Sequence, residues 1–332
     1  MPTQLLDNHG RPLDYVRIAV TDRCNLRCTY CMPAEGIQYV PRQQLLTFEE
    51  ILRLVQILAK MGVKKVRLTG GEPFLRKDFM KLLEALAQME GIEHIHLTTN
   101  GILTTPHIPA LKELGISGVN LSLDTLDRER FKTLTRRDEL EKVLLCLDEL
   151  VSSGIPTKLN AVIMAGQNTQ DVVPLARLAE EMPIAVRFIE EMPFNGQGFT
   201  PEQKPWTHRQ IQTALEEAFP GLEQIPAGPN STSRIFAAPA LTGKLGIIPA
   251  FSRTFCGSCN RIRITAKGLL KTCLYDDGVL DLRALVRSDA SDQDLEAAFL
   301  KAFGNRAKDG FEAEKRRNDS QSVSESMSTI GG

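Results

Sequence analysis

The sequence of 332 residues lacks the features that would place a protein at a membrane or on nucleic acid. No apolar run approaches the roughly 20 residues that cross a bilayer. Residues 1–12 are polar, without the positive start and apolar stretch of a signal peptide. Lys and Arg number 40 and Asp and Glu 41, which gives a net charge of −1 and no basic excess for a nucleic acid or a lipid surface. We therefore expect a cytoplasmic protein.

Cysteine is scarce, and its distribution argues against a disulfide framework. The chain has 7 cysteines, an odd number, and all but one fall into two tight groups, as metal ligands do. The remaining one, Cys146, lies on the apolar side of a helical pattern and is predicted to be a buried core thiol. Neither group has a fourth Cys or His close by. His9 is the nearest to the first group, and His208 lies far upstream of the second.

What the sequence does contain is a regular alternation of strand and helix patterns. Short β-branched runs predict strands at Val16–Val20, Lys65–Thr69, His94–Thr98, Gly118–Leu123, Lys158–Ile163 and Ala185–Glu190. Helical periodicity predicts helices at about 47–61, 76–90, 106–115, 139–153 and 171–182. Six βα units in series indicate a parallel sheet, and so many units favour a partial (β/α)6 barrel of the TIM type over an open doubly wound sheet. Either architecture gathers functional residues at the C-terminal ends of the strands.

The pattern changes after Met192, so we expect a barrel domain over residues 1–192 and a second domain over residues 193–332. Residues 193–205 are rich in Gly and Pro and are predicted to form a loop. Strand-like runs at Lys244–Ile248 and Arg261–Thr265 and a helix at Asp292–Phe303 indicate an α+β extension packed over the barrel. From residue 304 the chain becomes charged and then Ser-rich, which predicts a disordered or loosely attached tail.

The first cysteine group consists of Cys24, Cys28 and Cys31, in the spacing C-x3-C-x2-C after the first predicted strand. Three thiolates can hold three irons of a cubane iron–sulfur cluster and leave the fourth iron open, whereas electron-transfer clusters normally use four cysteines. An open iron suggests a site that binds a small molecule. Zinc would need a fourth ligand to complete its tetrahedron, and this spacing is not a familiar zinc-finger pairing.

The second group consists of Cys256, Cys259 and Cys273, in the spacing C-x2-C-x13-C. Zinc is a stronger competitor here, because C-x2-C is a common half of a zinc knuckle. Arg261 and Arg263 alternate along one predicted strand face, and guanidinium groups are bidentate partners of phosphate oxygens. Arg-x-Arg alone is as readily a solvated face. Beside a second open cluster, the pair favours an anionic substrate that also ligates iron.

With the aromatic Tyr30 just before its last cysteine, the first group resembles the signature of the radical S-adenosylmethionine (SAM) enzymes. The resemblance implies that the open iron of a [4Fe–4S] cluster binds SAM, and that the reduced cluster cleaves SAM to methionine and a 5′-deoxyadenosyl radical. It assigns SAM contacts to Tyr30, to Gly71 within Gly70-Gly71-Glu72-Pro73, to Ser122 and to Met192. Glycines there would let the backbone approach a ligand closely, and Glu72 could pair with an ammonium. On its own, the Gly-Gly run would more often be a turn, and a Met is usually core filler.

Both cysteine groups, their spacings and the terminal Gly-Gly together resemble the GTP 3′,8-cyclases of molybdenum cofactor biosynthesis, from about Asp14 to Gly332. This resemblance implies a lyase that cyclises GTP to (8S)-3′,8-cyclo-7,8-dihydroguanosine 5′-triphosphate, with a second [4Fe–4S] cluster that binds the guanine. It implies GTP contacts at Arg17, Arg67, Thr98, Lys158, Arg261, Ile262 and Arg263. Arg17 and Arg67 also fit a physical argument, because a cation on an otherwise apolar strand is costly without an anionic partner.

The resemblance also implies that Gly331 and Gly332 reach into the active site and are needed for activity, whereas a chain terminus by default has no role. It implies an external one-electron reductant and a downstream cyclic pyranopterin monophosphate synthase as partners, and it allows a homodimer. Two alternatives stay open. One is a radical SAM enzyme acting on a peptide, which would usually carry seven or more C-terminal cysteines. The other is a non-catalytic iron–sulfur or zinc scaffold, which would not cleave SAM.

Overall fold

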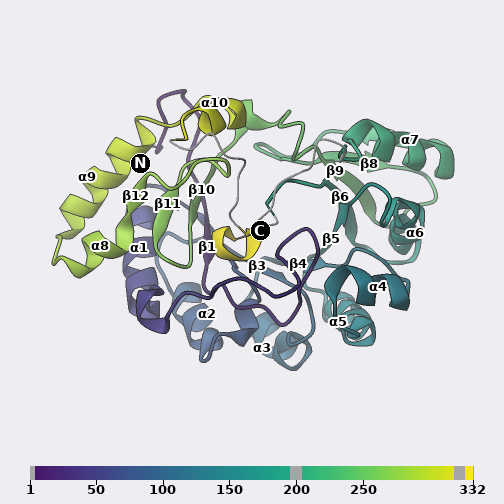
Figure 1. Cartoon of the computed structure of the whole chain (residues 1–332), viewed down its shortest axis with the longest axis horizontal. Coiled ribbons are helices and arrows are strands. Elements are labelled where there is room, and N and C mark those ends of the chain that lie inside the picture. Colours follow the sequence, from purple (N-terminus) through teal and green to yellow (C-terminus); the bar gives the residue numbers. More distant parts are fainter. Residues whose placement is uncertain (1–3, 195–203, 318–325, 332) are drawn as a thin grey trace.

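The computed structural model describes residues 4–194, 204–317 and 326–331, and a single curved sheet forms its centre (Figure 1). Within these residues the sheet has 12 strands in the order β12-β11-β10-β1-β2-β3-β4-β5-β6-β9-β8-β7. In the same ranges, no helix is both long enough and apolar enough to cross a membrane.

The middle of the sheet confirms the predicted barrel strands to within one residue at each end. They are β1 (Tyr15–Ala19), β2 (Lys65–Thr69), β3 (His94–Thr99), β4 (Gly118–Ser122), β5 (Thr157–Ile163) and β6 (Ala185–Glu190), all parallel to their neighbours. Side chains alternate across each strand. On β1, Val16 and Ile18 enter the core under the helices, while Arg17 faces the concave side. The same alternation on β2 buries Val66 and turns Arg67 to the concave side.

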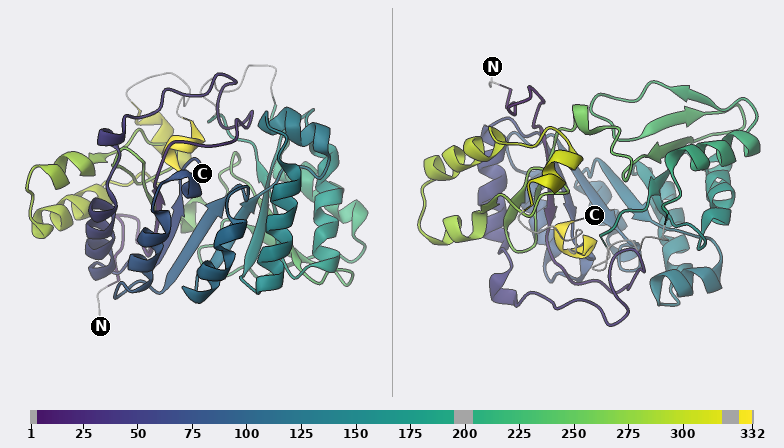
Figure 2. Two further views of the ribbon diagram at one scale, coloured as in Figure 1. Left: turned by 90° about the horizontal axis from the view of Figure 1, so that it is seen from below. Right: turned by 45° about the horizontal axis from the view of Figure 1, so that its top comes forward.

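Helices cover the outer side of these strands (Figure 2). They are α1 (Phe48–Lys60), α2 (Phe79–Ala87), α3 (Ile108–Glu113), α4 (Arg128–Thr135), α5 (Leu140–Ser153) and α6 (Val172–Glu181). A capping box starts α1, where Glu50 N–H donates to Thr47 Oγ1 (3.2 Å) and Thr47 N–H donates to Glu50 Oε2 (2.7 Å). Helix α4 was not predicted, because it is short and polar and its periodicity rests on few apolar side chains, Phe131 and Leu134 among them.

The strands of the second half differ from the expectation of a unit packed over the barrel, since they extend the barrel sheet at both edges (Figure 1). Strand β9 (Lys244–Ile248) pairs parallel with β6 and carries β8 (Arg234–Ala237) and β7 (Glu223–Ile225) beside it. Strand β10 (Arg261–Ile264) pairs parallel with β1 and carries β11 (Leu269–Lys271) and β12 (Leu280–Asp281). The reason is that an open barrel leaves unpaired backbone groups on both edge strands. Helices α7 (His208–Ala218), α8 (Leu282–Arg287) and α9 (Asp292–Phe303) pack on these extensions.

Residues 304–317 form defined structure, which corrects the expected loose tail for this part of the chain; residues 318–325 of the expected tail lie outside the described residues. Asp309 starts α10 (Gly310–Lys315) by accepting from the backbone N–H groups of Phe311 and Glu312. Arg306 is 2% exposed and forms an ion pair with Asp7 (3.1 Å), a long-range contact that composition cannot indicate. Helix α11 (Met327–Ile330) lies near the centre of the molecule in Figure 1. Of the predicted loop over residues 193–205, residues 195–203 lie outside the described residues.

Candidate functional site

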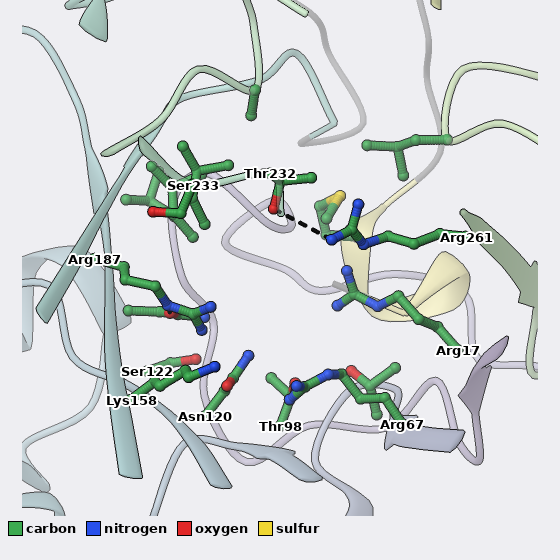
Figure 3. Close-up of a pocket in the computed structure, with 18 of the residues that line it drawn as sticks. Arg17, Arg67, Thr98, Asn120, Ser122, Lys158, Arg187, Thr232, Ser233 and Arg261 are labelled. Carbon is green, nitrogen blue, oxygen red and sulfur yellow. Dashed lines mark hydrogen bonds between the residues drawn. The ribbon is translucent and has the colours of Figure 1, made fainter. Parts of the chain in front are cut away.

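A cavity of about 720 Å³ lies on the concave side of the sheet, within the range of small-molecule sites (Figure 3). Most residues singled out from the sequence line it. They are Arg17, Cys24, Cys28, Tyr30, Cys31, Arg67, Gly71, Thr98, Ser122, Lys158, Met192, Cys256, Cys259, Arg261, Arg263 and Cys273. The fold therefore brings both cysteine groups and the predicted cations to one space.

Among the described residues that were singled out, Ile262, Gly331 and Glu72 do not line this cavity. Ile262 is fully buried in the hydrophobic core, because it alternates with Arg261 and Arg263, which face the cavity. Gly331 is buried, and a Cβ there would lie 2.7 Å from Thr69 Cγ2. Gly332 lies outside the described residues.

The first cysteine group occupies the loop after β1, at the C-terminal end of the strand. Its turn is closed by Cys31 N–H donating to Cys28 O (2.9 Å), and Asn100 Nδ2 donates to Cys24 Sγ (3.7 Å). Burial raises the pKa of Cys24 to about 12 and that of Cys31 to about 11, and it raises the pKa of Cys28 well above its usual value. The thiolates needed as metal ligands are therefore unfavourable without a cation, and metal binding would release protons.

The Gly-Gly run after β2 packs against this loop. Gly71 N–H donates to Thr21 O (2.8 Å), and Glu72 N–H donates to Arg23 O (2.8 Å). A Cβ on Gly71 would overlap the Arg23 carbonyl group and lie 3.0 Å from Asp22 O. The sequence indicated a close approach to a ligand. The structure shows that the approach is to the backbone leading into Cys24, while Gly71 also borders the cavity.

Glu72 does not face the cavity, contrary to the expectation that it could pair with an ammonium. Its carboxylate is fully buried and accepts from Thr99 Oγ1 (2.9 Å) and from the backbone N–H groups of Asn100 (2.8 Å) and Phe74 (3.2 Å). Burial raises the pKa of Glu72 to about 7. The short helical turn after Glu72 directs the side chain inward, where it fixes the loop that carries Asn100 beside Cys24.

Asp124 is a cavity residue that sequence reasoning did not single out. It is buried beside Tyr30, and its Oδ1 accepts from Val162 N–H (2.8 Å). Burial raises the pKa of Asp124 to about 6, and burial together with the Asp124 charge raises the pKa of Tyr30 well above its usual value. The available signal was the position of Asp124 just after β4, where polar residues of a barrel gather.

The second cysteine group differs from the first in its electrostatics. Burial alone would raise the pKa of Cys259, but the charges of Arg306, Arg261 and Arg263 lower it to about 7. Burial raises the pKa of Cys273 to about 11 and also raises that of Cys256. The second group therefore contains one thiol that ionises readily and two that do not.

Each group brings three cysteines to the cavity, a number that is compatible with an iron–sulfur cluster. Within the described ranges, no three Cys, His, Asp or Glu side chains are placed so that they could hold one metal ion. A cubane differs in this respect, because each thiolate binds its own iron and the sulfurs stay apart. Three converging cysteines with no fourth ligand suit that arrangement.

Cations are prominent in the wall of the cavity, where Arg17, Arg67, Lys158, Arg187 and Arg261 point into one space (Figure 3). Burial, together with neighbouring arginines, lowers the pKa of Arg17 and Arg187 to about 9 and that of Lys158 to about 8. Although burial would raise the pKa of Tyr15, the charges of Arg67, Arg17 and Arg261 lower it to about 7. Such shifts indicate a strongly positive space that favours a ligand with several negative charges.

Several donors in this wall remain available for such a ligand. Arg187 donates through Nε to Asn160 Oδ1 (2.9 Å), but its buried Nη2 has no hydrogen-bond partner among the described residues. Arg261 Nη1 is also buried and has no hydrogen-bond partner among the described residues, while Arg261 Nη2 donates to Asn230 O (3.2 Å) in the loop before β8. Arg67 differs, because it donates to Tyr15 Oη (2.6 Å) and to Leu97 O (2.8 Å).

Arg187 and Asn160 were missed in the sequence, although a signal was present. Arg187 is a cation between Val186 and Phe188, two fully buried strand residues, so it has the same alternation that pointed to Arg17. No comparable signal exists for residues 226–233, which also line the cavity, because their loop has no periodicity.

Each half of the chain matches a known protein family. Residues 18–179 match the radical SAM superfamily, and residues 184–311 match the Molybdenum Cofactor Synthesis C family. The chain is 39% identical over 330 residues to a GTP 3′,8-cyclase of Chlorobaculum tepidum, covering 99% of this chain and 97% of that protein.

Longer animal proteins are also similar. Identity is 41% over 303 residues to Molybdenum cofactor biosynthesis protein 1 of Bos taurus, covering 91% of this chain and 48% of that protein. The chain thus spans about half the length of these animal relatives. Among solved structures, SuiB of Streptococcus suis bound to S-adenosylmethionine has a TM-score of 0.55 at 17% identity, covering 87% of this chain and 69% of that chain. At that identity the likeness concerns the fold alone, and it agrees with the expected partial barrel.

Proposed function

The chain belongs to the GTP 3′,8-cyclase family of the radical SAM superfamily, and we propose that it joins the ribose 3′ carbon of GTP to C8 of its guanine, an early step of molybdenum cofactor biosynthesis. The observation that carries this proposal is the cavity itself. One end is bordered by Cys24, Cys28 and Cys31, the other by Cys256, Cys259 and Cys273, and cations line its wall. A nucleoside triphosphate has an anionic end for the cations and a base for the second group. A cationic wall is therefore a better match for a nucleoside triphosphate than for a peptide.

The radical SAM family implies a [4Fe–4S] cluster on the first group and SAM beside it, and when bound these supply a 5′-deoxyadenosyl radical. We assign the contacts to SAM to Tyr30, Gly71, Ser122 and Met192, all of which line the same cavity as the first group. Gly71 has no side chain, so its backbone atoms form part of the cavity wall. Asp124, held by Val162 N–H, fixes the Tyr30 ring beside the cysteines.

The triphosphate of GTP is assigned to Arg17, Arg67, Thr98 and Lys158, and the structure adds Arg187 to this set. Arg261 and Arg263 lie between these cations and the second group, and Ile262 holds them in register from the core. We propose a second [4Fe–4S] cluster on Cys256, Cys259 and Cys273 that receives the guanine. The enclosing loop, residues 226–233, would keep water from the bound nucleotide.

We assign Gly331 and Gly332 to the catalytic region through α11. Ser326 Oγ donates to Cys31 O (2.7 Å), so the start of α11 is tied to the first cysteine loop, and Met327 and Ser328 border the cavity. Gly331 fits against Thr69 and Ala19 only because it has no side chain.

We further propose a division into a barrel domain of residues 1–192 and a substrate domain of residues 193–332. The reaction would need an external one-electron reductant, and a cyclic pyranopterin monophosphate synthase would take the product onward. A homodimer is compatible with this function.

The proposal is tested with anaerobically reconstituted protein supplied with dithionite, SAM and GTP. We expect 5′-deoxyadenosine and a cyclised nucleotide that is an isomer of GTP, because the hydrogen atom lost from the ribose is replaced by one electron and one proton. Chromatography separates this isomer from GTP, and mass spectrometry detects it at the mass of GTP. Absence of 5′-deoxyadenosine would contradict radical SAM chemistry. Formation of 5′-deoxyadenosine with unchanged GTP would contradict only the substrate.

The affinity for GTP is expected to fall above pH 8. Lys158 has a pKa of about 8 in the free protein, and a bound triphosphate favours its charged form, so binding takes up a proton once the lysine has lost one. Between pH 7 and pH 9 the dissociation constant should rise about tenfold through this group alone. The measurement is equilibrium binding in a Tyr15→Phe background, which removes one other cavity group whose pKa lies in this range; Arg17 and Arg187, with a pKa of about 9, are present in both proteins that are compared. Adding Lys158→Arg should flatten the profile, because arginine stays charged; an equally steep profile in that variant would contradict the assignment.

A further inference from the structure

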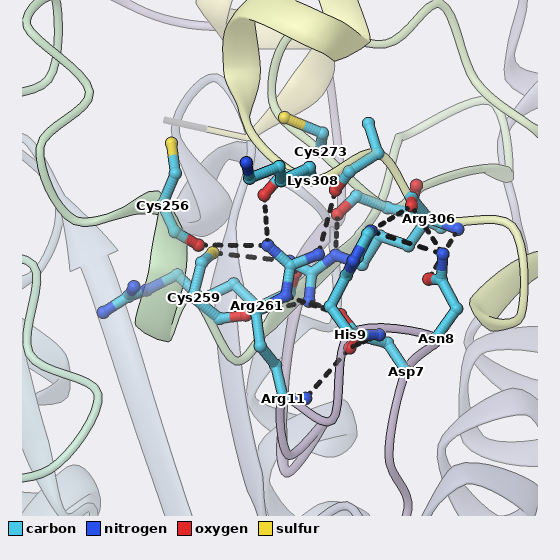
Figure 4. Close-up of polar contacts among 12 residues, drawn as sticks. Asp7, Asn8, His9, Arg11, Cys256, Cys259, Arg261, Cys273, Arg306 and Lys308 are labelled. Carbon is cyan, nitrogen blue, oxygen red and sulfur yellow. Dashed lines mark hydrogen bonds and ion pairs between the residues drawn. The ribbon is translucent and has the colours of Figure 1, made fainter.

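A buried pair of arginines, Arg11 and Arg306, lies beside the second cysteine group (Figure 4), and neither of them lines the cavity. Arg306 is 2% exposed and donates to the backbone on both sides of the group, through Nε to Thr272 O (2.8 Å) and through Nη1 to Cys259 O (2.8 Å). Its Nη2 donates to Arg261 O (2.9 Å) and to Cys259 Sγ (3.4 Å). One guanidinium therefore joins the loop of Cys259 to the residue before Cys273.

Asp7 holds this guanidinium in place. Its Oδ2 accepts from Arg306 Nη1 (3.1 Å) and from Arg11 Nε (2.7 Å), and its side chain is fully buried. Arg11 then donates to Cys256 O (3.0 Å) and to Lys308 O (2.7 Å). Two buried cations share one carboxylate, so the site keeps an excess positive charge directly beside the cysteines.

The two arginines differ in one respect. Both bond to carbonyl groups of the second group, but of the two only Arg306 reaches a cysteine sulfur in the described contacts. A charged N–H donor stabilises negative charge on the sulfur that accepts from it, and hydrogen bonds to cluster sulfurs are one of the factors that set reduction potentials. In the described contacts, Cys256 and Cys273 accept from neutral backbone N–H groups, those of Gly310 and Tyr275, whereas Cys259 accepts from a charged guanidinium.

We propose that Arg306 is a positioning residue for the second cysteine group, fixing Cys259 relative to Cys273 and raising the reduction potential of the cluster held there. Asp7 orients Arg306. Arg11 holds the backbone at Cys256 in place and does not affect the reduction potential of the cluster. The inference rests on the proposed second cluster and deepens it, because it makes the three ligands unequal.

The test uses the full chain with Cys24, Cys28 and Cys31 replaced by alanine, so that only the second cluster assembles. Iron and sulfide content, the electron paramagnetic resonance spectrum of the reduced cluster and its midpoint potential are measured without SAM or GTP. We expect Arg306→Met to lower the ratio of reduced to oxidised cluster about tenfold at a fixed applied potential, a shift of about 59 mV for one electron. Arg306→Lys keeps the charge but not the directed donors, so it should shift the potential in the same direction by less.

Arg11→Lys is the matched control, because Arg11 shares Asp7 and the backbone contacts but touches no sulfur. It should lower iron retention and leave the potential and spectrum unchanged. Equal potentials in the parent and the Arg306 variants would overturn the inference while leaving the second cluster in place. If Arg306→Met holds no iron, Arg306→Lys decides by the same criterion. A parent protein that assembles no second cluster would instead overturn that part of the proposed function, and the inference with it.

Discussion

Replacement of Gly71 by alanine is expected to prevent assembly of the first cluster and to reduce cleavage of SAM at least about 100-fold. A Cβ at this position would overlap the carbonyl group of Arg23, which precedes Cys24 directly. The atoms that the new Cβ would meet belong to the backbone of Arg23, so no side-chain rotation can relieve the overlap. It is relieved only when the Gly-Gly run moves away from the cysteine loop, and this movement breaks the hydrogen bonds from Gly71 N–H to Thr21 O and from Glu72 N–H to Arg23 O. Displacement of about 1 Å in a catalytic group is sufficient for a loss of this size.

The measurement is iron content after reconstitution, together with the yield of 5′-deoxyadenosine. Gly257→Ala is the control, because Gly257 also lies beside a cysteine ligand, but a Cβ there meets nothing within 4 Å. It should keep both clusters and nearly full activity. A Gly71→Ala protein with a normal first cluster would show that the tight contact between the two loops is dispensable.

Replacement of Cys273 by alanine is expected to separate the two halves of the reaction. The first group follows β1 and packs against the loops after β2 and β3, whereas Cys273 follows β11 and is held by Asp276 Oδ2, which accepts from Cys273 N–H (2.8 Å). The variant should therefore retain about half of the iron and still cleave SAM when reduced. Cyclisation of GTP should fall at least about 100-fold, because the guanine loses its anchor and the ribose its position relative to the radical.

Cys146→Ala controls for the loss of a thiol. Cys146 is fully buried in the hydrophobic core under the barrel strands, as its position in the sequence indicated. Its replacement should cost about 1 kcal/mol of stability, visible as a lower unfolding midpoint, and leave iron content and both products unchanged. If Cys273→Ala still cyclised GTP at the original rate, the second group would not be the guanine site.

The strands, helices and cysteine groups on which both predictions depend could be predicted from the sequence to different degrees. The six barrel strands and most of the helices that cover them follow from periodicity and capping, which act over a few residues, as Thr47 and Glu50 do in α1. The first cysteine triad was visible for the same reason, since its three members lie in one loop. The second was visible as a C-x2-C pair followed by Cys273, which β10 and β11 separate from the pair. Arg17 and Arg67 were visible because a cation between apolar strand residues must face something other than the core.

The tertiary structure decided what lies far apart in the chain. Pairing of β10 with β1 and of β9 with β6 joins segments that have no common local pattern, and it is this pairing that brings the second cysteine group to the cavity of the first. It likewise set the inward turn of Glu72, whose partners lie on the next strand, and the contact of Asp7 with Arg306 across nearly the whole chain. By itself the sequence determined the elements and the chemistry of each loop, because those depend on neighbouring residues. Which loops meet depended on the edges left open by the barrel, and only the folded chain supplies their partners.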